Sequence, residues 1–273
     1  MARRRLDAEL VRRGLVASRT EALVAVREGL VLVAGVPAPK PSTLVDPGEP
    51  VELLGPARRF VSRGGEKLDA AIVRFGVEVR GRRCLDAGAS TGGFTDCLLR
   101  RGAQHVVAVD VGYGQLAWSL RSDPRVTVLE RTNVRDLRPT DLPYACDLVV
   151  ADLSFISLRL VVPALARVAA DRADLVLLVK PQFEVGPADL GRGGVVRDEA
   201  AWARAIMAVA LECVASGLEP VGVMASPLPG PAGNVEFPLH ARMGAGSGGP
   251  DLAVQDAVAE GRVIARRGTG DRP

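Results

Sequence analysis

Aromatic residues, paired cysteines and long apolar runs are all scarce in this chain of 273 residues. Its four cysteines, Cys84, Cys97, Cys146 and Cys213, show no CxxC spacing. This argues against a zinc site or a disulfide framework and predicts buried free thiols in a reducing compartment. No apolar stretch approaches the ~20 residues of a membrane helix, and no apolar secretory segment follows the basic N-terminus. We expect a cytoplasmic monomer without a metal or a membrane.

The overall composition is that of a globular protein, with 48% hydrophobic and 25% charged residues. The length suits one large domain or two modest ones. The net charge is only +3, so the charge alone is a weak indication of a polyanionic partner, and its distribution along the chain matters more.

The first 55 residues predict a small α+β unit. Segments 6–15 and 18–30 repeat apolar residues at helical spacing, and 31–36 and 50–54 read as short strands. Ser18 is expected to cap the second helix, with Glu21 completing a capping box.

Arginines cluster on these two helices and could form a cationic face for phosphates, although a solvated helix surface explains them equally well. The candidates for RNA binding are Arg3, Arg4, Arg5, Arg12, Arg19 and Arg27. The stretch "SRTEALVAVREGLVLVAGV" resembles an S4 domain, and this resemblance implies RNA binding. We place this domain at 1–55, a linker at 56–64 and a second domain at 65–273.

From residue 83 onward, apolar strands alternate with helical segments. The expected strands are 83–88, 105–111, 126–131, 147–154, 174–181, 220–226 and 235–241. The expected helices are 65–76, 92–101, 115–121, 156–170, 198–216 and 251–266. Such alternation predicts an α/β fold with a parallel, doubly wound sheet.

The segment "CLDAGASTGGF" follows a strand and opens a helix, as a nucleotide-binding loop does. Ser90 replaces the middle glycine of G-x-G-x-x-G, which argues against a dinucleotide. Asp86 suits a ligand with a positive amino group, such as S-adenosylmethionine, and Asp110 could accept both ribose hydroxyls. Another nucleotide in the same fold is the alternative. The candidate cofactor residues are Asp86, Gly88, Ser90, Thr91, Gly92, Gly93, Phe94, Asp110, Val111, Asn133 and Val134.

Charged residues stand where apolar strands end. Asp152, Lys180 and Glu236 lie at three strand ends, and Lys67 lies in the helix before the sheet. Ligands of an open α/β sheet bind at the carboxyl ends of its strands. We therefore expect these four residues to form one catalytic site, against the alternative of separate surface ion pairs.

The order and context of these four residues resemble the Lys-Asp-Lys-Glu tetrad of FtsJ-like ribose 2′-O-methyltransferases. With "FVSRGGEKL", "LDAGASTGGFTDCLL", "ADLSFISL", "VKPQFE" and "GNVEF", the chain resembles the TlyA (hemolysin-A-like) family along nearly its whole length. The resemblance implies a Rossmann-like class I methyltransferase fold, with a seven-stranded, mostly parallel sheet whose last strand is antiparallel. It also implies S-adenosylmethionine-dependent 2′-O-methylation of cytidine in 16S or 23S ribosomal RNA, with 30S and 50S subunits as partners.

Two points stay open at this stage. Lys180 could take the proton of the ribose hydroxyl or stabilise the developing oxyanion. Competing functions are a non-catalytic ribosome-assembly factor, a membrane-active hemolysin and a pseudouridine synthase with an S4 domain.

Pro238 is expected to disturb the last strand.

Overall fold

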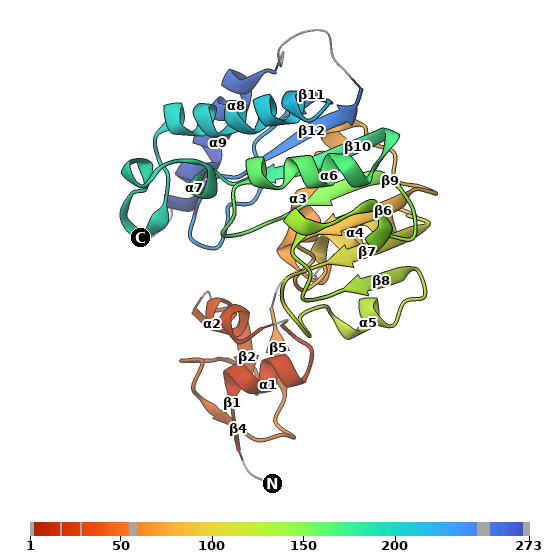
Figure 1. The fold of residues 1–273 in the computed structure, drawn as a ribbon. Helices are drawn as coiled ribbons and strands as arrows, with labels where there is room; N and C mark the ends of the chain where they lie inside the picture. The colour runs from red at the N-terminus through yellow and green to blue at the C-terminus, as the bar shows by residue number, and fades with distance from the viewer. Residues whose placement is uncertain (1–2, 17, 28, 55–58, 245–251, 270–273) are drawn as a thin grey trace. The chain divides into compact units, whose positions relative to one another are not determined.

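The computed structural model describes residues 3–16, 18–27, 29–54, 59–244 and 252–269 (Figure 1). The chain forms two compact units, Met1–Val61 and Ser62–Pro273. The division falls within the linker expected at 56–64, of which residues 56–58 lie outside the described residues.

The N-terminal unit contains two helices, α1 (Leu6–Arg12) and α2 (Arg19–Arg27). Its strands are β1 (Arg4–Arg5), β2 (Val31–Val33), β3 (Val36–Pro37), β4 (Leu44–Val45) and β5 (Val51–Leu53). Strands β3, β2 and β5 form one sheet, and β1 pairs with β4. The Ser18 hydroxyl accepts a hydrogen bond from the Glu21 amide at 3.2 Å, which confirms Ser18 as the cap of α2.

The C-terminal unit is built on a seven-stranded sheet in the order β11-β12-β10-β9-β6-β7-β8. Its strands are β6 (Arg83–Ala87), β7 (His105–Val109), β8 (Val126–Leu129), β9 (Cys146–Ala151), β10 (Ala169–Val179), β11 (Leu218–Val223) and β12 (Phe237–Met243). Only β12 runs antiparallel to its neighbours, β10 and β11. The predicted mostly parallel sheet with an antiparallel last strand is therefore confirmed.

Helices cover both faces of this sheet (Figure 1). They are α3 (Arg63–Phe75), α4 (Gly93–Arg100), α5 (Trp118–Arg121), α6 (Val162–Val168), α7 (Pro181–Glu184), α8 (Glu199–Ala215) and α9 (Val254–Thr269). Short 3-10 turns add η1 (Val134–Asp136), η2 (Pro139–Asp141), η3 (Leu158–Leu160), η4 (Pro187–Asp189) and η5 (Arg192–Gly194). The one-turn helix α7, which follows Lys180 directly, had no signal in the apolar pattern.

Successive residues of each strand point to opposite faces of the sheet, and this alternation determines on which side of the sheet each residue packs. On β10, Leu175, Leu177 and Val179 pack with α6, α8 and α9. Val176 and Leu178 line the opposite face together with residues of α3 and α4. Because the parallel strands are covered on both faces, they read as continuous apolar runs.

Several details differ from the sequence-based expectation. The helix expected at 156–170 is divided into η3 and α6, and β10 already begins at Ala169. The short strands β1, β3 and β4 were not predicted as separate strands. Strand β9 ends at Ala151, so Asp152 lies just past it. Pro238 lies inside β12 opposite Leu178, and the strand continues to Met243 without a break. The expectation that Pro238 disturbs this strand is wrong, because a proline near the start of a strand removes a single N–H donor and leaves its carbonyl free to accept from Met224. All four cysteines are buried and free, as predicted.

Candidate functional site

The loop between β6 and α4 depends on glycine for its close packing. Gly88 has a φ of +87°, and a Cβ there would lie 2.6 Å from the Asp152 carbonyl oxygen. A Cβ on Gly93 would lie 2.2 Å from the Ser62 hydroxyl oxygen. Any side chain at these positions would push the loop away from the start of α3 and from Asp152.

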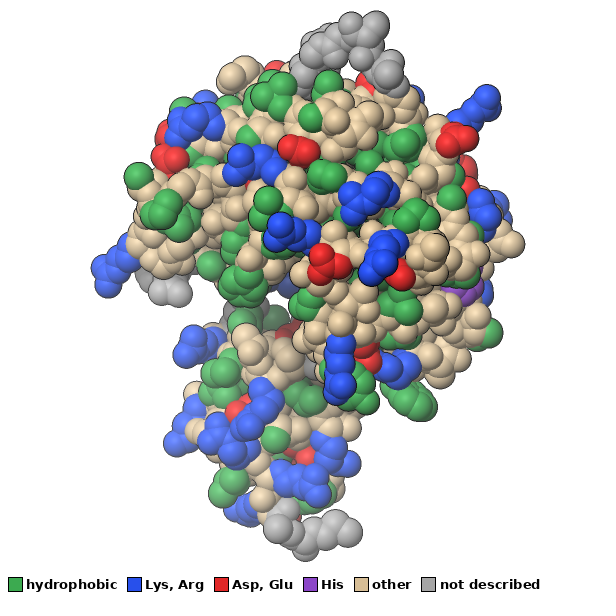
Figure 2. All heavy atoms as spheres, in the orientation of Figure 1, with side chains coloured by type: hydrophobic (Ala, Val, Ile, Leu, Met, Phe, Trp, Pro, Cys, Tyr) green, Lys and Arg blue, Asp and Glu red, His purple; other side chains and the backbone are tan. Residues whose placement is uncertain are grey.

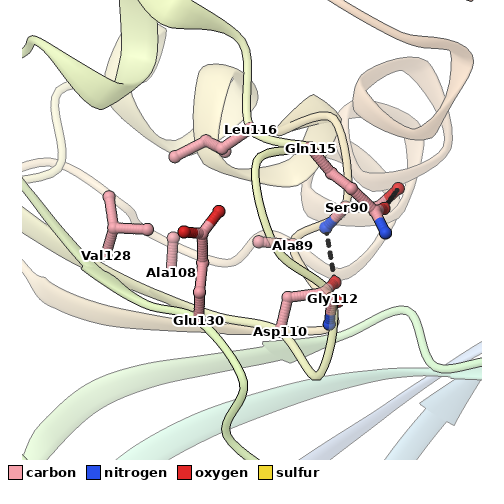
Figure 3. A pocket seen from close by; sticks show the side chains of 9 residues that line it. All are labelled: Ala89, Ser90, Ala108, Asp110, Gly112, Gln115, Leu116, Val128 and Glu130. Carbon is pink, nitrogen blue, oxygen red and sulfur yellow. Dashed lines mark hydrogen bonds between the residues drawn. The ribbon is translucent and has the colours of Figure 1, made fainter.

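A recess of about 220 Å3 opens beside this loop (Figure 3). Its walls are apolar, and Asp110 and Glu130 supply carboxylates, as the sticks in Figure 3 show. The Ser90 amide donates to one oxygen of Asp110 at 2.8 Å, and the Gly112 amide donates to the other at 2.7 Å. Each carboxylate oxygen keeps a second lone pair, so Asp110 is held in place and can still accept hydrogen bonds from a ligand.

Of the predicted cofactor residues, Ser90 and Asp110 line this recess. The others do not line it: Asp86, Gly88, Thr91, Gly92, Gly93, Phe94, Val111, Asn133 and Val134. Val134 points into the hydrophobic core. The structure adds Gln115 and Leu116 as lining residues that the sequence analysis did not select. Their position in "GYGQL", just after Asp110, was the available signal.

Asp86 lies beneath the loop and is fully buried. The Thr95 hydroxyl donates to its Oδ2 at 2.6 Å, whereas Oδ1 has no hydrogen-bond partner among the described residues. Burial raises the pKa of Asp86 to about 7. The unpartnered oxygen is compatible with a positively charged ligand group near the loop. The assignment of Asp86 to cofactor binding stays a prediction.

The four catalytic candidates share one face of the sheet. Asp152 and Lys180 continue the alternation of β9 and β10 toward the face that α3 covers. Glu236 precedes β12 with the same parity, and the antiparallel direction of β12 places its start at the edge where the parallel strands end. Lys67 reaches this face from α3.

The tetrad is arranged as two ion pairs. Lys67 Nζ lies 2.5 Å from Glu236 Oε2, and Lys180 Nζ lies 2.6 Å from Asp152 Oδ1. The side chains of the first pair are 8% and 2% exposed, and those of the second are 10% and 24% exposed. A Cβ on Gly64, in the first turn of α3, would lie 3.7 Å from Asp152 Oδ2, so this turn lies beside Asp152. Asp152 is the most accessible group of the four, which makes the Lys180 pair the better candidate to meet a substrate.

The choice of lysine at these positions is itself informative. The chain contains 32 arginines but only three lysines, Lys40, Lys67 and Lys180. Arginine stays protonated in proteins, whereas a lysine ammonium is compact and can lose its proton. Two of the three lysines therefore occupy positions where an amine offers chemistry that a guanidinium does not.

Two phenylalanines lie close to the Lys180 pair along the chain. Phe155 is 92% exposed and has a φ of +65°, an unusual backbone conformation for a bulky residue. Its ring centroid lies 5.4 Å from that of Phe183. Each phenylalanine follows a catalytic candidate by three residues, Asp152 and Lys180 respectively, and that spacing was the signal that the sequence analysis missed.

The arginines of the N-terminal unit divide into two groups. Arg5 and Arg19 pair with the buried Asp7, Arg12 pairs with the buried Glu9, and Arg3 pairs with Asp46. Among the described residues, Arg4 and Arg27 form no ion pair, and both are exposed. Lys and Arg side chains cover much of this unit on the face in Figure 2. All six arginines keep their proposed role in RNA binding, but four of them also hold acidic side chains of the fold.

None of the helices within the described ranges is both long and apolar enough to cross a membrane. In the same part of the chain, no cluster of three or more His, Cys, Asp or Glu side chains could hold a metal ion.

Comparisons with known proteins agree with this geometry. Residues 60–243 match the FtsJ-like methyltransferase family, and residues 4–51 match the S4 domain. A 16S/23S rRNA (cytidine-2′-O)-methyltransferase TlyA from Mycobacterium tuberculosis is 55% identical, over 96% of this chain and all of the relative. Hemolysin A from Brachyspira hyodysenteriae is 36% identical, over 86% of this chain and 98% of the relative.

A solved structure from Streptococcus thermophilus, described as a hemolysin, has a TM-score of 0.80 and 36% identity. It covers 99% of this chain and all of its own. The likeness therefore extends over both units and over the segments that hold the tetrad and the glycine loop. The chain belongs to the FtsJ-like methyltransferases and, within them, to the TlyA family.

Proposed function

We propose that this chain transfers a methyl group from S-adenosylmethionine to the ribose 2′-hydroxyl of a cytidine in ribosomal RNA. The observation that supports this most directly is the pair of lysine–carboxylate contacts on one sheet face, at the ends of the strands. The relative named for this activity is similar over nearly the whole of both chains.

The recess suits the adenosine part of the cofactor. Its apolar walls would accept the adenine, and Asp110, already fixed by two backbone amides, would accept the ribose hydroxyls. The glycine loop would lie along the methionine part, with the buried Asp86 carboxyl group beneath it. When bound, S-adenosylmethionine supplies a methyl group on a sulfonium, which an oxygen nucleophile can attack.

Lys180 is the group proposed to act on the substrate hydroxyl. A ribose hydroxyl is a poor nucleophile until it loses its proton, so an amine beside it can take that proton or stabilise the oxygen as charge develops. Asp152 holds the amine from one side at 2.6 Å and stays accessible from the rim. Holding the hydroxyl in line with the methyl group would contribute much of the rate.

Lys67 and Glu236 are proposed to support this centre from behind. Both side chains are almost fully enclosed, so neither is placed to meet bulk solvent. Their pair joins α3 to the residue before β12. A buried pair of this kind is strongly destabilised when one partner is removed.

Phe155 is proposed to contact the target base. A nucleotide inside folded RNA must leave its stack to reach a recessed site, and aromatic side chains commonly stack on such bases. Phe155 is exposed, supported by Phe183 and close along the chain to Asp152. Stacking there would leave the ribose near Lys180.

The S4 domain and its arginines are proposed to bind the surrounding RNA through phosphates. The substrates are proposed to be the small and large ribosomal subunits, as the name of the M. tuberculosis relative indicates for that protein. We further propose that the chain acts as a monomer in the cytoplasm.

The test is transfer of labelled methyl groups to purified 30S and 50S subunits. With the wild type we expect label in RNA, 2′-O-methylcytidine in the digest and resistance of one bond to alkaline hydrolysis. Lys180→Ala is expected to abolish transfer while cofactor binding persists. Lys180→Arg keeps the charge, so loss of activity in that variant would favour proton transfer over oxyanion stabilisation.

The matched control is Lys40→Arg, the same change at the one lysine outside the proposed site. This variant should keep wild-type activity. If wild type binds the cofactor but labels neither subunit, the proposed substrate is wrong, and an assembly role or another RNA would replace it. Near-normal turnover by Lys180→Ala would remove Lys180 from the mechanism.

A further inference from the structure

Lys180 Nζ has two polar neighbours that differ in kind. It donates a hydrogen bond to the Ser154 hydroxyl oxygen at 3.0 Å. Asp152 Oδ1 is closer, at 2.6 Å, yet its direction does not satisfy hydrogen-bond geometry, and this oxygen has no hydrogen-bond partner among the described residues. The directional contact of the amine is therefore the one to Ser154.

This difference decides what each neighbour can do. An ionic attraction depends mainly on distance and leaves the amine free to rotate about the Cε–Nζ bond. A hydrogen bond weakens steeply when its angle departs from linear, so it fixes that rotation. Asp152 therefore holds the Lys180 amine near the end of the strand. Ser154 fixes the rotation of the amine and so sets the directions of its other two N–H positions.

We propose that Ser154 is a positioning residue that orients Lys180 toward the substrate hydroxyl. With one N–H directed to Ser154, two tetrahedral positions of Nζ remain, and one of them can meet the ribose oxygen while the Asp152 carboxylate lies beside the amine. That orientation serves Lys180 equally whether it accepts the hydroxyl proton or donates to the developing oxyanion. The proposal rests on the proposed function of Lys180.

Hydrogen bonds at both ends hold the loop that carries Ser154. At its far end, the buried Glu184 accepts hydrogen bonds from the Ser157 hydroxyl at 2.5 Å and the Leu158 amide at 2.7 Å. At its near end, the Asp152 amide donates to the Ala87 carbonyl at 3.0 Å. The Ser154 hydroxyl thus lies between two fixed points, and the exposed side chain leaves room for a substituent.

The experiment compares Ser154→Ala, Ser154→Thr and Ser157→Ala in methyl transfer to ribosomal subunits. Ser154→Ala should lower kcat about tenfold to a hundredfold, as expected for loss of a hydrogen bond to a charged group. Its KM for the subunits and its affinity for S-adenosylmethionine should stay at wild-type values. Ser154→Thr keeps the hydroxyl and should recover most of kcat.

Ser157→Ala is the comparison variant, because it removes a hydroxyl that holds the same loop without contacting Lys180. Its Tm should fall, and its kcat should fall clearly less than that of Ser154→Ala. An equal fall in kcat for both alanine variants, or no recovery by threonine, would overturn the proposal, since general loosening of the loop would then explain the loss. A wild-type kcat for Ser154→Ala would also overturn it. These results differ from failure of the proposed function, in which wild type itself leaves no label in RNA.

Discussion

The buried pair of Lys67 and Glu236 leads to the sharpest prediction on stability. Lys67→Met and Glu236→Gln each leave one charge without its partner, in side chains that are 8% and 2% exposed. Removing one member of such a pair costs about 3–5 kcal/mol, because the remaining charge loses its partner without regaining water. For a unit of this size, each kcal/mol lowers Tm by roughly 2–4 °C, so each variant should melt about 6–20 °C lower.

The double variant Lys67→Met/Glu236→Gln removes both charges together. Replacing a whole buried ion pair by neutral groups of similar size is often close to neutral for stability. The double variant should therefore recover most of the lost Tm, although none of the three variants should regain methyl transfer. The coupling free energy from this double-mutant cycle measures the pair itself.

The assay is scanning calorimetry of all four proteins, combined with methyl transfer to ribosomal subunits. If both single variants melt within a degree or two of wild type, water reaches the pair and the argument from burial fails. If the two single effects simply add in the double variant, the residues contribute through packing and not through their charges. Recovery of both stability and activity in the double variant would remove the pair from catalysis.

Three further predictions concern other parts of the chain. Burial raises the pKa of Asp86 to about 7, so the folded protein holds a proton there that the unfolded chain releases above about pH 4. Between about pH 4 and pH 7 the free energy of unfolding should therefore fall by roughly 4 kcal/mol as the pH rises, because only the folded state holds this proton. Asp86→Asn should flatten the dependence of Tm on pH over this range. An unchanged slope would contradict the raised pKa of Asp86. Phe155→Ala should raise KM for the ribosomal substrate roughly five- to 150-fold at constant cofactor affinity, which steady-state kinetics would test against an unchanged KM. Arg4→Ala should weaken RNA binding at unchanged Tm and lower the slope of log K against log salt by about 0.7–0.9. Arg12→Ala should also lower Tm, because the buried Glu9 would lose one of its two arginine partners and keep Arg13. Equal Tm values for the two arginine variants would refute this distinction.

Much of the catalytic unit could be predicted from the sequence because its signals are local. Continuous apolar runs between helical segments predicted the parallel sheet, and the glycine loop after the first strand predicted the nucleotide recess. Asp152 and Lys180 were recognisable because each follows an apolar strand directly, and the carboxyl ends of parallel strands lie at one edge. The parity of these residues within their strands would also have placed both on the face that α3 covers.

Local sequence patterns could not predict the ion-pair partners of these residues. Nothing near Lys67 in the sequence indicates that its ammonium is bound by Glu236, 169 residues away. The same holds for the arginines of the N-terminal unit, whose clustering suggested one cationic face. In the fold, Arg5, Arg12 and Arg19 turn toward the buried Asp7 and Glu9, and only the tertiary contacts separate them from Arg4 and Arg27.

The sequence by itself determined the order of strands and helices, the family and the residues at the strand ends, because periodicity and motif spacing are properties of the chain. Only the tertiary structure decided that Asp86 lies fully buried below the loop and that Ser154 holds Lys180. Burial and hydrogen-bond direction depend on which segments meet in space and on the angles at which they meet, and a linear pattern of residues specifies neither.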